Sequence, residues 1–450
     1  MKVAKFGGSS VASAEQIRKV GRIVADDPDR RIVVVSAPGK RFPGDTKVTD
    51  MLIGMAQARL SGESGEPQLT ALIERYASIA RDLELPEATL EPISADLRQR
   101  MKSDHSNTDQ YLDNLKAAGE DNCARLFAQA LRSVFNLDAH YVSPRDAGLL
   151  MSSEFGNAQV LPESYLNLES LASRPGVTVF PGFFGYTREG QVATFPRGGS
   201  DITGSILAAA VKADLYENFT DVDSVYAADP RIVEKPNPID ILTYHEMREL
   251  SYAGFGVFHD EAIIPAVQAN IPICVKNTNR PEAPGTMIVP HREHKAGTVT
   301  GVASNEGFCS IFVEKFLMNR QVGFGRRLLQ ILEEENLSFQ HMPTGIDNIS
   351  VIFREQGFTA EMETRIIARI RETLDPDQLS VEHGLALVMI VGEGMNHSVG
   401  IAGRATTALA RAGVNIEMIN QGSSELSMMF GVKAQDRAKA VRALYEELGR

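Results

Sequence analysis

The stretch KVAKFGGSS, residues 2–10, decides how the first half of the chain is read. Residues 2–6 alternate between apolar and other side chains, which favours a β-strand that ends at the diglycine. Ser13 and Gln16 then match the capping pattern of a helix N-terminus. Glycines allow close approach to the backbone, and helix N-terminal amides attract anions. Strand, turn and helix start therefore predict a phosphate cradle, to which Lys5 adds a positive charge.

Taken alone, the diglycine is more simply explained as a tight strand-to-helix turn. The stretch matches neither the P-loop pattern G-x-x-x-x-G-K-[ST] nor the dinucleotide-binding pattern G-x-G-x-x-G. The phosphate interpretation therefore depends on what the rest of the chain adds.

The composition narrows the class of protein. The 450 residues, 43% of them hydrophobic, are enough for roughly three domains. No apolar run reaches the roughly 18 residues of a membrane span and no signal-peptide pattern opens the chain, so we expect a cytoplasmic protein without a membrane partner. The net charge of −12 and the lack of a Lys/Arg-rich block argue against a nucleic-acid partner. Three widely spaced cysteines predict free thiols.

A second glycine-rich segment, PRGGSDITG at residues 196–204, leads into a helix of small residues. Arg197 beside a diglycine predicts another anion site, because a guanidinium can bind a carboxylate through two hydrogen bonds. Residues 216–225 read as a strand that runs into an acidic turn. Continuous apolar strands such as residues 31–37 alternate with helical patterns over roughly the first 300 residues, which predicts an α/β sandwich.

Residues 117–122 (AAGEDN) are interpreted as the segment that precedes an amphipathic helix ending at Leu131. On that interpretation Glu120 has a purely structural alternative, since it could cap the helix that follows Gly119.

From about residue 304 the sequence repeats itself with an offset of 77 residues. The shared pattern is strand, helix, two strands, helix. A repeat of this length is too long for a solenoid unit, so it predicts two copies of a small α+β domain. The matched pairs include Met318 and Met395, Asn319 and Asn396, Gly323 and Gly400, Arg327 and Arg404, Gly345 and Gly422, and Phe353 and Phe430.

Four motifs occur in one order: KFGGSS at 5–10, GE at 119–120, RGGSD at 197–201 and TDV at 220–222. This set resembles the aspartate kinases of the amino-acid kinase family, and the repeat resembles their paired ACT domains. In detail it looks most like the monofunctional, lysine-sensitive bacterial enzymes, and because the chain ends after the second repeat, no fused homoserine dehydrogenase is expected. The resemblance implies a three-layer αβα catalytic domain at residues 1–300 and α+β ACT domains at 304–378 and 379–450.

The resemblance implies ATP-dependent phosphorylation of the side-chain carboxylate of L-aspartate to 4-phospho-L-aspartate, the first step towards lysine, threonine and methionine. Lys5 and Asp201 would be catalytic, with Lys5 balancing charge on the transferring phosphoryl group. Mg²⁺ would be held mainly through ATP, and no metal site built from side chains is expected. The expected substrate contacts are Thr49, Glu120, Arg197 and Ser200. The expected nucleotide contacts are Lys5, Gly7, Gly8, Ser9, Thr220, Asp221, Tyr226 and Arg231.

Two other functions remain open from the sequence: another amino-acid kinase, of the glutamate or acetylglutamate type, and a non-catalytic amino-acid sensor. Arg197 would hold an α-carboxylate and Glu120 an α-ammonium, which argues against an N-acylated substrate. Intact Lys5, Arg197 and Asp201 oppose a degenerate kinase domain.

Two positions weaken the nucleotide assignment. Related enzymes often carry a lysine near ATP where this chain has Gly256, so that contact is not assigned. Arg231, which follows Asp229-Pro230, also suits a surface ion pair.

In each repeat copy a Met-Asn pair and a glycine lie where the first strand gives way to a helix, and amides there suit the carboxylate of an amino acid. The resemblance implies inhibition by lysine, alone or with threonine, and a homodimer or larger homo-oligomer through the ACT domains. Alternatively, the repeat only dimerises the enzyme. The first copy is favoured for lysine because Asp347 offers a carboxylate to a second ammonium. The candidate effector residues are Met318, Asn319, Gly323, Phe324, Asp347, Asn396 and Gly400.

Overall fold

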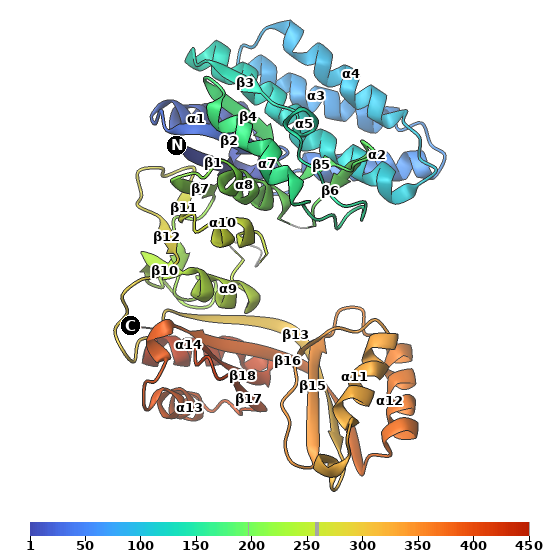
Figure 1. Cartoon of the computed structure of the whole chain (residues 1–450), viewed down its shortest axis with the longest axis vertical. Helices are drawn as coiled ribbons and strands as arrows, with labels where there is room; N and C mark the ends of the chain where they lie inside the picture. Colours follow the sequence, from blue (N-terminus) through green and yellow to red (C-terminus); the bar gives the residue numbers. More distant parts are fainter. Residues whose placement is uncertain (197, 257–260, 450) are drawn as a thin grey trace. The chain divides into compact units, whose positions relative to one another are not determined.

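The computed structural model describes residues 1–196, 198–256 and 261–449 (Figure 1). The contacts divide the chain into two compact units. The first comprises residues 1–225, 238–247 and 256–292, and the second comprises residues 226–237, 248–255 and the chain from residue 293 onward. Among the described residues, no helix combines the length and the apolar character that a membrane crossing requires.

An eight-stranded sheet forms the centre of the first unit, in the order β10-β12-β11-β7-β1-β2-β4-β3. The six strands from β11 to β3 are parallel, whereas β12 runs antiparallel to β11 and β10 runs parallel to β12. The strands are β1 (Lys2–Phe6), β2 (Arg30–Val35), β3 (Ala139–Tyr141), β4 (Val177–Pro181), β7 (Leu215–Thr220), β10 (Ile241–Thr243), β11 (Ile273–Asn277) and β12 (Thr286–Val289).

Helices cover both faces of this sheet, which confirms the predicted sandwich (Figure 1). Alternate strand residues such as Ala4 and Phe6 pack with α1 and α5 in one core. The side chain of Lys5, between them in β1, points to the opposite face, where α8 lies. The helices on the α5 side are α1 (Ala14–Ala25), α2 (Val48–Leu60), α3 (Glu66–Asp82), α4 (Leu90–Met101) and α5 (Thr108–Phe135). Those on the α8 side are α7 (Glu163–Glu169), α8 (Gly199–Ala210) and α10 (Ile264–Gln268).

The remaining elements are short. They are η1 (Gly8–Val11), η2 (Glu87–Thr89), α6 (Pro144–Ala147), η3 (Ser170–Ser173), β5 (Phe184–Tyr186), β6 (Val192–Thr194), β8 (Val225–Tyr226), β9 (Pro238–Ile239) and α9 (Tyr244–Tyr252). Ser13 caps α1 by accepting a hydrogen bond from the Gln16 amide, as its sequence pattern predicts. All three cysteines are buried and unpaired, as predicted.

Helix α5 corrects the predicted break at residues 117–122. It is continuous from Thr108 to Phe135 and contains Gly119 and Glu120 in its middle, so Glu120 is not a helix cap. The glycine is there for packing: a Cβ on Gly119 would lie 2.7 Å from Cβ of Ala37. The small residues in this helix therefore allow a close contact with a loop. Because that contact is not visible in the sequence, the pattern of small and polar residues is interpreted as a loop.

The second unit contains a six-stranded antiparallel sheet in the order β14-β15-β13-β16-β18-β17. The offset of 77 residues is reproduced in three dimensions, because β13 and β16, α11 and α13, and α12 and α14 each begin 77 residues apart. The strands are β13 (Gly301–Glu314), β14 (Phe339–His341), β15 (Asn348–Arg354), β16 (Gln378–Val391), β17 (Met418–Gln421) and β18 (Ser427–Lys433). The helices are α11 (Phe324–Glu334), α12 (Ala360–Leu374), α13 (Ile401–Arg411) and α14 (Arg437–Leu448), with short turns η4 (Met318–Arg320), η5 (Glu393–Met395) and η6 (Ala434–Asp436).

The two copies share their longest strands, which the sequence pattern does not reveal. The second half of β13 pairs with β15, whereas its first half pairs with the half of β16 that also pairs with β18. The register of β13 against β16 shifts beside Gly307, and Gly307 and Gly384 both adopt left-handed backbone conformations (φ +83° and +67°). Figure 1 shows β13 and β16 side by side along both copies.

Beside this register shift, His383 on β16 contacts Glu355, which follows β15, and Glu363 on α12. The ring nitrogens of His383 lie 2.7 Å from a carboxylate oxygen of Glu355 and 3.0 Å from one of Glu363. Hydrogen bonding to Glu355, followed by Glu363, raises the pKa of His383 above its ordinary value. Only the protonated ring can donate to both carboxylates.

We expect His383 to make stability depend on pH. A raised pKa in the folded state stabilises the protein fully below the unfolded pKa, and this contribution is lost as pH rises through the folded pKa. The wild type should therefore melt above His383→Gln at pH 6 by an amount that shrinks towards pH 8, with at most about 1 kcal/mol at stake for such an exposed pair. Thermal melts of both proteins across this range test it, and a constant difference would contradict it.

Candidate functional site

The candidate site lies at the carboxyl edge of the large sheet. Since β1, β2, β4, β7 and β11 are parallel, the loops that follow them meet at one edge. Ligands of open α/β sheets bind at this edge. The described residues among those predicted for the first unit come from the ends of β1 and β7, from the loops that follow these strands, from the N-termini of α2 and α8, and from the middle of α5.

Lys5 and Asp201 form a buried ion pair. The Lys5 ammonium lies 2.5 Å from Oδ1 of Asp201, and the residue is 7% exposed. Asn218, which is the register partner of Lys5 on β7, donates from Nδ2 to the same oxygen at 2.6 Å. The structure thus brings together the two residues that the sequence predicts as catalytic, and it adds Asn218 as their neighbour.

The loops after β1 and β2 touch through two glycines. The Gly39 amide donates to the Gly8 carbonyl at 2.8 Å, and a Cβ on Gly39 would lie 2.7 Å from the Gly8 carbonyl carbon. A Cβ on Gly7 would lie 3.6 Å from Nζ of Lys5. Neither loop has room for side chains at the two contacting positions, so the backbone itself forms the surface beside Lys5. The diglycine continues into the short turn η1, with Ser9 exposed, and α1 begins only at Ala14.

Glu120 is a buried carboxylate with an unused oxygen. It is 6% exposed, and no group in the described part of the chain forms a hydrogen bond with its Oε2. Burial raises its pKa from 4.5 to about 8, although hydrogen bonding from the Ala37 backbone partly opposes this. A buried acceptor without a partner is costly, so the position suits a cationic group of a ligand.

The other predicted substrate contacts are less complete. Ser200 lies at the start of α8 and packs against Gly182, where a Cβ would lie 2.6 Å from the Ser200 Oγ. Thr49 is half-buried in the first turn of α2. Arg197 lies outside the described residues, so its role stays a prediction.

On the nucleotide side, the Thr220 hydroxyl donates to Asp221 at 3.2 Å where β7 ends. Tyr226 and Arg231 belong to the second unit, and their roles stay predictions. The Arg231 guanidinium is exposed and pairs with Asp229 at 2.8 Å, which is the surface ion pair that the sequence left open.

The predicted effector residues of the second unit divide into two groups. Met318 and Phe324 are buried in the core beneath α11, whereas Asn319 and Asn396 are exposed. Oδ1 of Asp347 accepts a hydrogen bond from the Leu317 amide at 2.9 Å, so part of its carboxylate already holds the loop. Equivalent left-handed glycines precede the two helices: Gly323 before α11 and Gly400 before α13.

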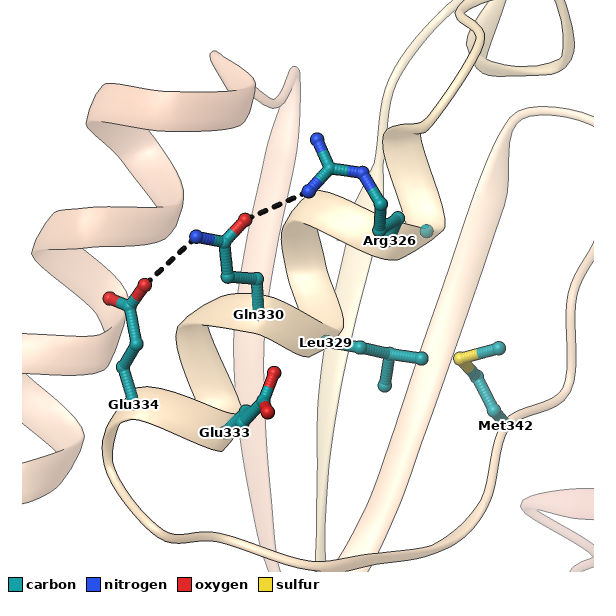
Figure 2. Close-up of a pocket in the computed structure, with 7 residues that line it drawn as sticks. Arg326, Leu329, Gln330, Glu333, Glu334 and Met342 are labelled. Carbon is teal, nitrogen blue, oxygen red and sulfur yellow. Dashed lines mark hydrogen bonds between the residues drawn. The ribbon is translucent and has the colours of Figure 1, made fainter.

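An open groove of about 910 Å³ runs along the outer face of α11 (Figure 2). Figure 2 shows a polar ladder on this helix, in which Arg326 donates to Gln330 and Gln330 donates to Glu334, each at 2.9 Å. Leu329 and Met342 form the apolar side of the groove. None of the predicted effector residues lines this groove.

The sequence model of the Amino acid kinase family matches residues 1–277, and that of the ACT domain matches residues 388–448. The first match covers more than half of the chain. The chain therefore belongs to the amino acid kinase family.

Within this family the chain is similar to aspartokinases. Aspartokinase 3 of Bacillus subtilis is 57% identical over 447 residues, which cover 99% of this chain and 98% of that protein. The chain is a member of the aspartokinases.

Solved structures agree over the whole length. The aspartate kinase of Clostridium acetobutylicum is 37% identical with a TM-score of 0.87, and the match covers all of both chains. Aspartokinase III of E. coli also matches over all of both chains: its complex with aspartate and ADP is 26% identical with a TM-score of 0.78, and its complex with lysine and aspartate is 27% identical with a TM-score of 0.75.

We expect Glu120 to destabilise the unliganded protein at alkaline pH. Its raised pKa favours the neutral form in the folded state, so this stabilisation is lost as pH rises through about 8. Between pH 7 and 9 the wild type should lose about 1 kcal/mol more than Glu120→Gln, since one pKa unit corresponds to about 1.4 kcal/mol. Melting curves of both proteins without ligand measure this, and parallel pH profiles would show that the carboxyl is ionised at pH 7.

Proposed function

We propose that this chain transfers the γ-phosphoryl group of ATP to the side-chain carboxylate of L-aspartate, giving 4-phospho-L-aspartate and ADP. The single observation that carries the proposal is the 57% identity to an aspartokinase over almost the whole of both chains. The geometry of the first unit fits this reaction, with a buried cation beside a glycine-lined backbone surface and an unpartnered carboxylate on the neighbouring helix.

Lys5 supplies charge where phosphoryl transfer needs it. Catalysis of this reaction is mainly positioning and charge neutralisation, and a fixed ammonium in a water-poor site does both. Asp201 and Asn218 hold the position of Lys5 through the shared Oδ1 atom. The attacking group of aspartate is a carboxylate that is ionised at pH 7, so the site needs no strong general base.

Glu120 selects for a free amino group. Its Oε2 lacks a partner, and the α-ammonium of aspartate supplies one. An N-acylated substrate has no such cation, which separates this activity from acetylglutamate phosphorylation. In this proposal Arg197 holds the α-carboxylate, and Thr49 and Ser200 complete the contacts with aspartate.

ATP and Mg²⁺ fit the same edge of the sheet. The close Gly8–Gly39 contact leaves backbone rather than side chains for the phosphates to meet, and Gly7, Ser9, Thr220 and Asp221 flank it. We propose that Mg²⁺ is held mainly through the phosphates of ATP, whose charge it neutralises. The buried, unpaired cysteines fit the reducing cytoplasm in which we place the enzyme.

We further propose that the second unit senses lysine, alone or with threonine, and joins two copies of the chain. E. coli aspartokinase III has been solved with lysine and aspartate bound. The loops before α11 and α13 present left-handed glycines and an exposed asparagine in each copy. The edge strands β14 and β17 leave unpaired backbone groups in a single chain, which pairing between copies would satisfy.

Lys5→Ala should lower kcat for aspartate phosphorylation by about 10²-fold or more, because a fixed charge at the transferring group is lost. A coupled assay of aspartate-dependent ADP release measures this. Lys212→Ala is the matched control, since that exposed lysine lies beyond the C-terminal end of α8, where it pairs with Glu169. Normal turnover of Lys5→Ala with an unchanged melting temperature would contradict the role of Lys5.

Asn319→Ala should raise the lysine concentration for half-inhibition by about tenfold, because an amide contact to a charged ligand is worth roughly 1.5 kcal/mol. Asn396→Ala, at the equivalent position of the second copy, is the control and should shift inhibition less than twofold. Inhibition curves with lysine, threonine and both decide the matter. A wild-type enzyme that is inhibited by neither lysine, nor threonine, nor both together would contradict the sensing role and leave only the contact between two copies of the chain.

A further inference from the structure

A buried arginine on α3 lies next to the site without belonging to any predicted motif. Arg75 is 4% exposed and follows Leu69 and Leu72 on the apolar face of that helix. A charge in such a position is costly unless hydrogen bonds and an opposite charge compensate for it. Its partners therefore explain why the chain keeps a cation there.

The guanidinium binds three residues in the two loops beside the diglycine turn. Nη2 donates to the carbonyl of Gly39 at 2.6 Å and to that of Ala12 at 3.2 Å. Nη1 donates to the carboxylate of Asp45 at 2.8 Å. Ala12 follows η1 in the loop after β1, whereas Gly39 and Asp45 lie in the loop after β2, so one side chain ties both loops together.

The Gly39 end of this link reaches the groups proposed to bind both substrates. The Gly39 amide donates to the Gly8 carbonyl, so its position fixes the diglycine turn. Two residues earlier in the same loop, Ala37 packs against the helix turn that carries Glu120, because a Cβ on the neighbouring Gly119 would lie 2.7 Å from the Ala37 Cβ. A shift of Gly39 would therefore change the distance between the phosphate cradle and the carboxylate on α5.

The Asp45 end fixes the rest of the loop. Asp45 accepts hydrogen bonds from the Arg41 amide at 2.9 Å and from its guanidinium at 2.8 and 2.9 Å. At the end of the loop, the Val48 amide donates to the Pro38 carbonyl at 3.1 Å and leads into α2. The segment 38–48 is therefore held at both ends, with Arg75 beneath it.

We propose that Arg75 is a positioning residue for phosphoryl transfer, which sets the spacing between the diglycine cradle and Glu120 by binding the Gly39 and Ala12 carbonyls and Asp45. It does not itself touch aspartate or ATP. The proposal rests on the proposed function, because the spacing matters only if phosphate and amino acid bind on the two sides of Gly39.

The first test is kinetic and uses Arg75→Lys, which keeps the charge but loses the planar fork that reaches two carbonyls and a carboxylate at once. We expect kcat to fall at least about tenfold with a smaller change in either KM, since small misplacement of reacting groups costs up to about 100-fold. Asp45→Asn should give a similar fall, and the double variant should be little worse than the poorer single variant. The control cycle uses Arg81→Gln and Glu74→Gln, an exposed pair on the same helix that should change kcat less than twofold.

The second test needs no substrate and separates this proposal from the proposed function. Amide hydrogen exchange in segments 7–12 and 36–48 should accelerate at least about fivefold in Arg75→Lys and stay unchanged in Arg81→Gln. If the wild type showed no aspartate-dependent ADP release, the proposed function would fail whatever the exchange results. A folded Arg75→Lys protein with kcat within twofold of the wild type, or with unaltered exchange in both segments, would overturn the positioning role even if its melting temperature fell.

Discussion

Lys5 and Asp201 meet at a point that little water reaches, with side chains 8% and 17% exposed. Opposite charges attract more strongly there than at the surface, and each would be costly to bury alone. The pair also fixes the geometry around it, since Lys5 is on a central strand and Asp201 on the first turn of α8. That turn begins after Gly198 in a left-handed conformation (φ +84°), so the helix can start close enough to the sheet for its aspartate to reach the lysine.

The charged groups buried around this edge are satisfied to different degrees. Within the described chain Arg75 has three oxygen partners, although its Nε has none, and Lys5 has Asp201, whereas one oxygen of Glu120 has no partner. In its charged form that oxygen needs a donor, and a cation suits it best because it also favours the charge that burial disfavours. An enzyme that binds an amino acid can tolerate such an unsatisfied acceptor, because the substrate removes the penalty when it binds.

Local patterns in the sequence are enough to predict many of the helices and strands and the repeat. The apolar run and diglycine predict β1 and its turn, and the 77-residue offset places the second-copy elements because equal sequences form equal elements. Partners far apart in the chain are not visible in such patterns. Arg75 looks like an interruption of an apolar helix face, Asn218 like a polar residue in a strand, and residues 117–122 like a loop, until the packing of Gly119 against Ala37 is known. Arg231 shows the opposite case, because its neighbour Asp229 already supplies a local partner.

The strands shared between the two repeat copies limit how either copy can be exchanged. If the chain is cut before residue 378, the first copy loses residues 378–382, the segment of β16 that pairs with its part of β13. If it is cut after residue 306, the second copy loses the segment of β13 that pairs with its part of β16. A chimaera that borrows a single copy from a relative would therefore expose an open sheet edge in both partners, with the hazard of aggregation that such an edge brings. The two copies therefore have to be exchanged together, and one copy alone can be altered only by point substitutions.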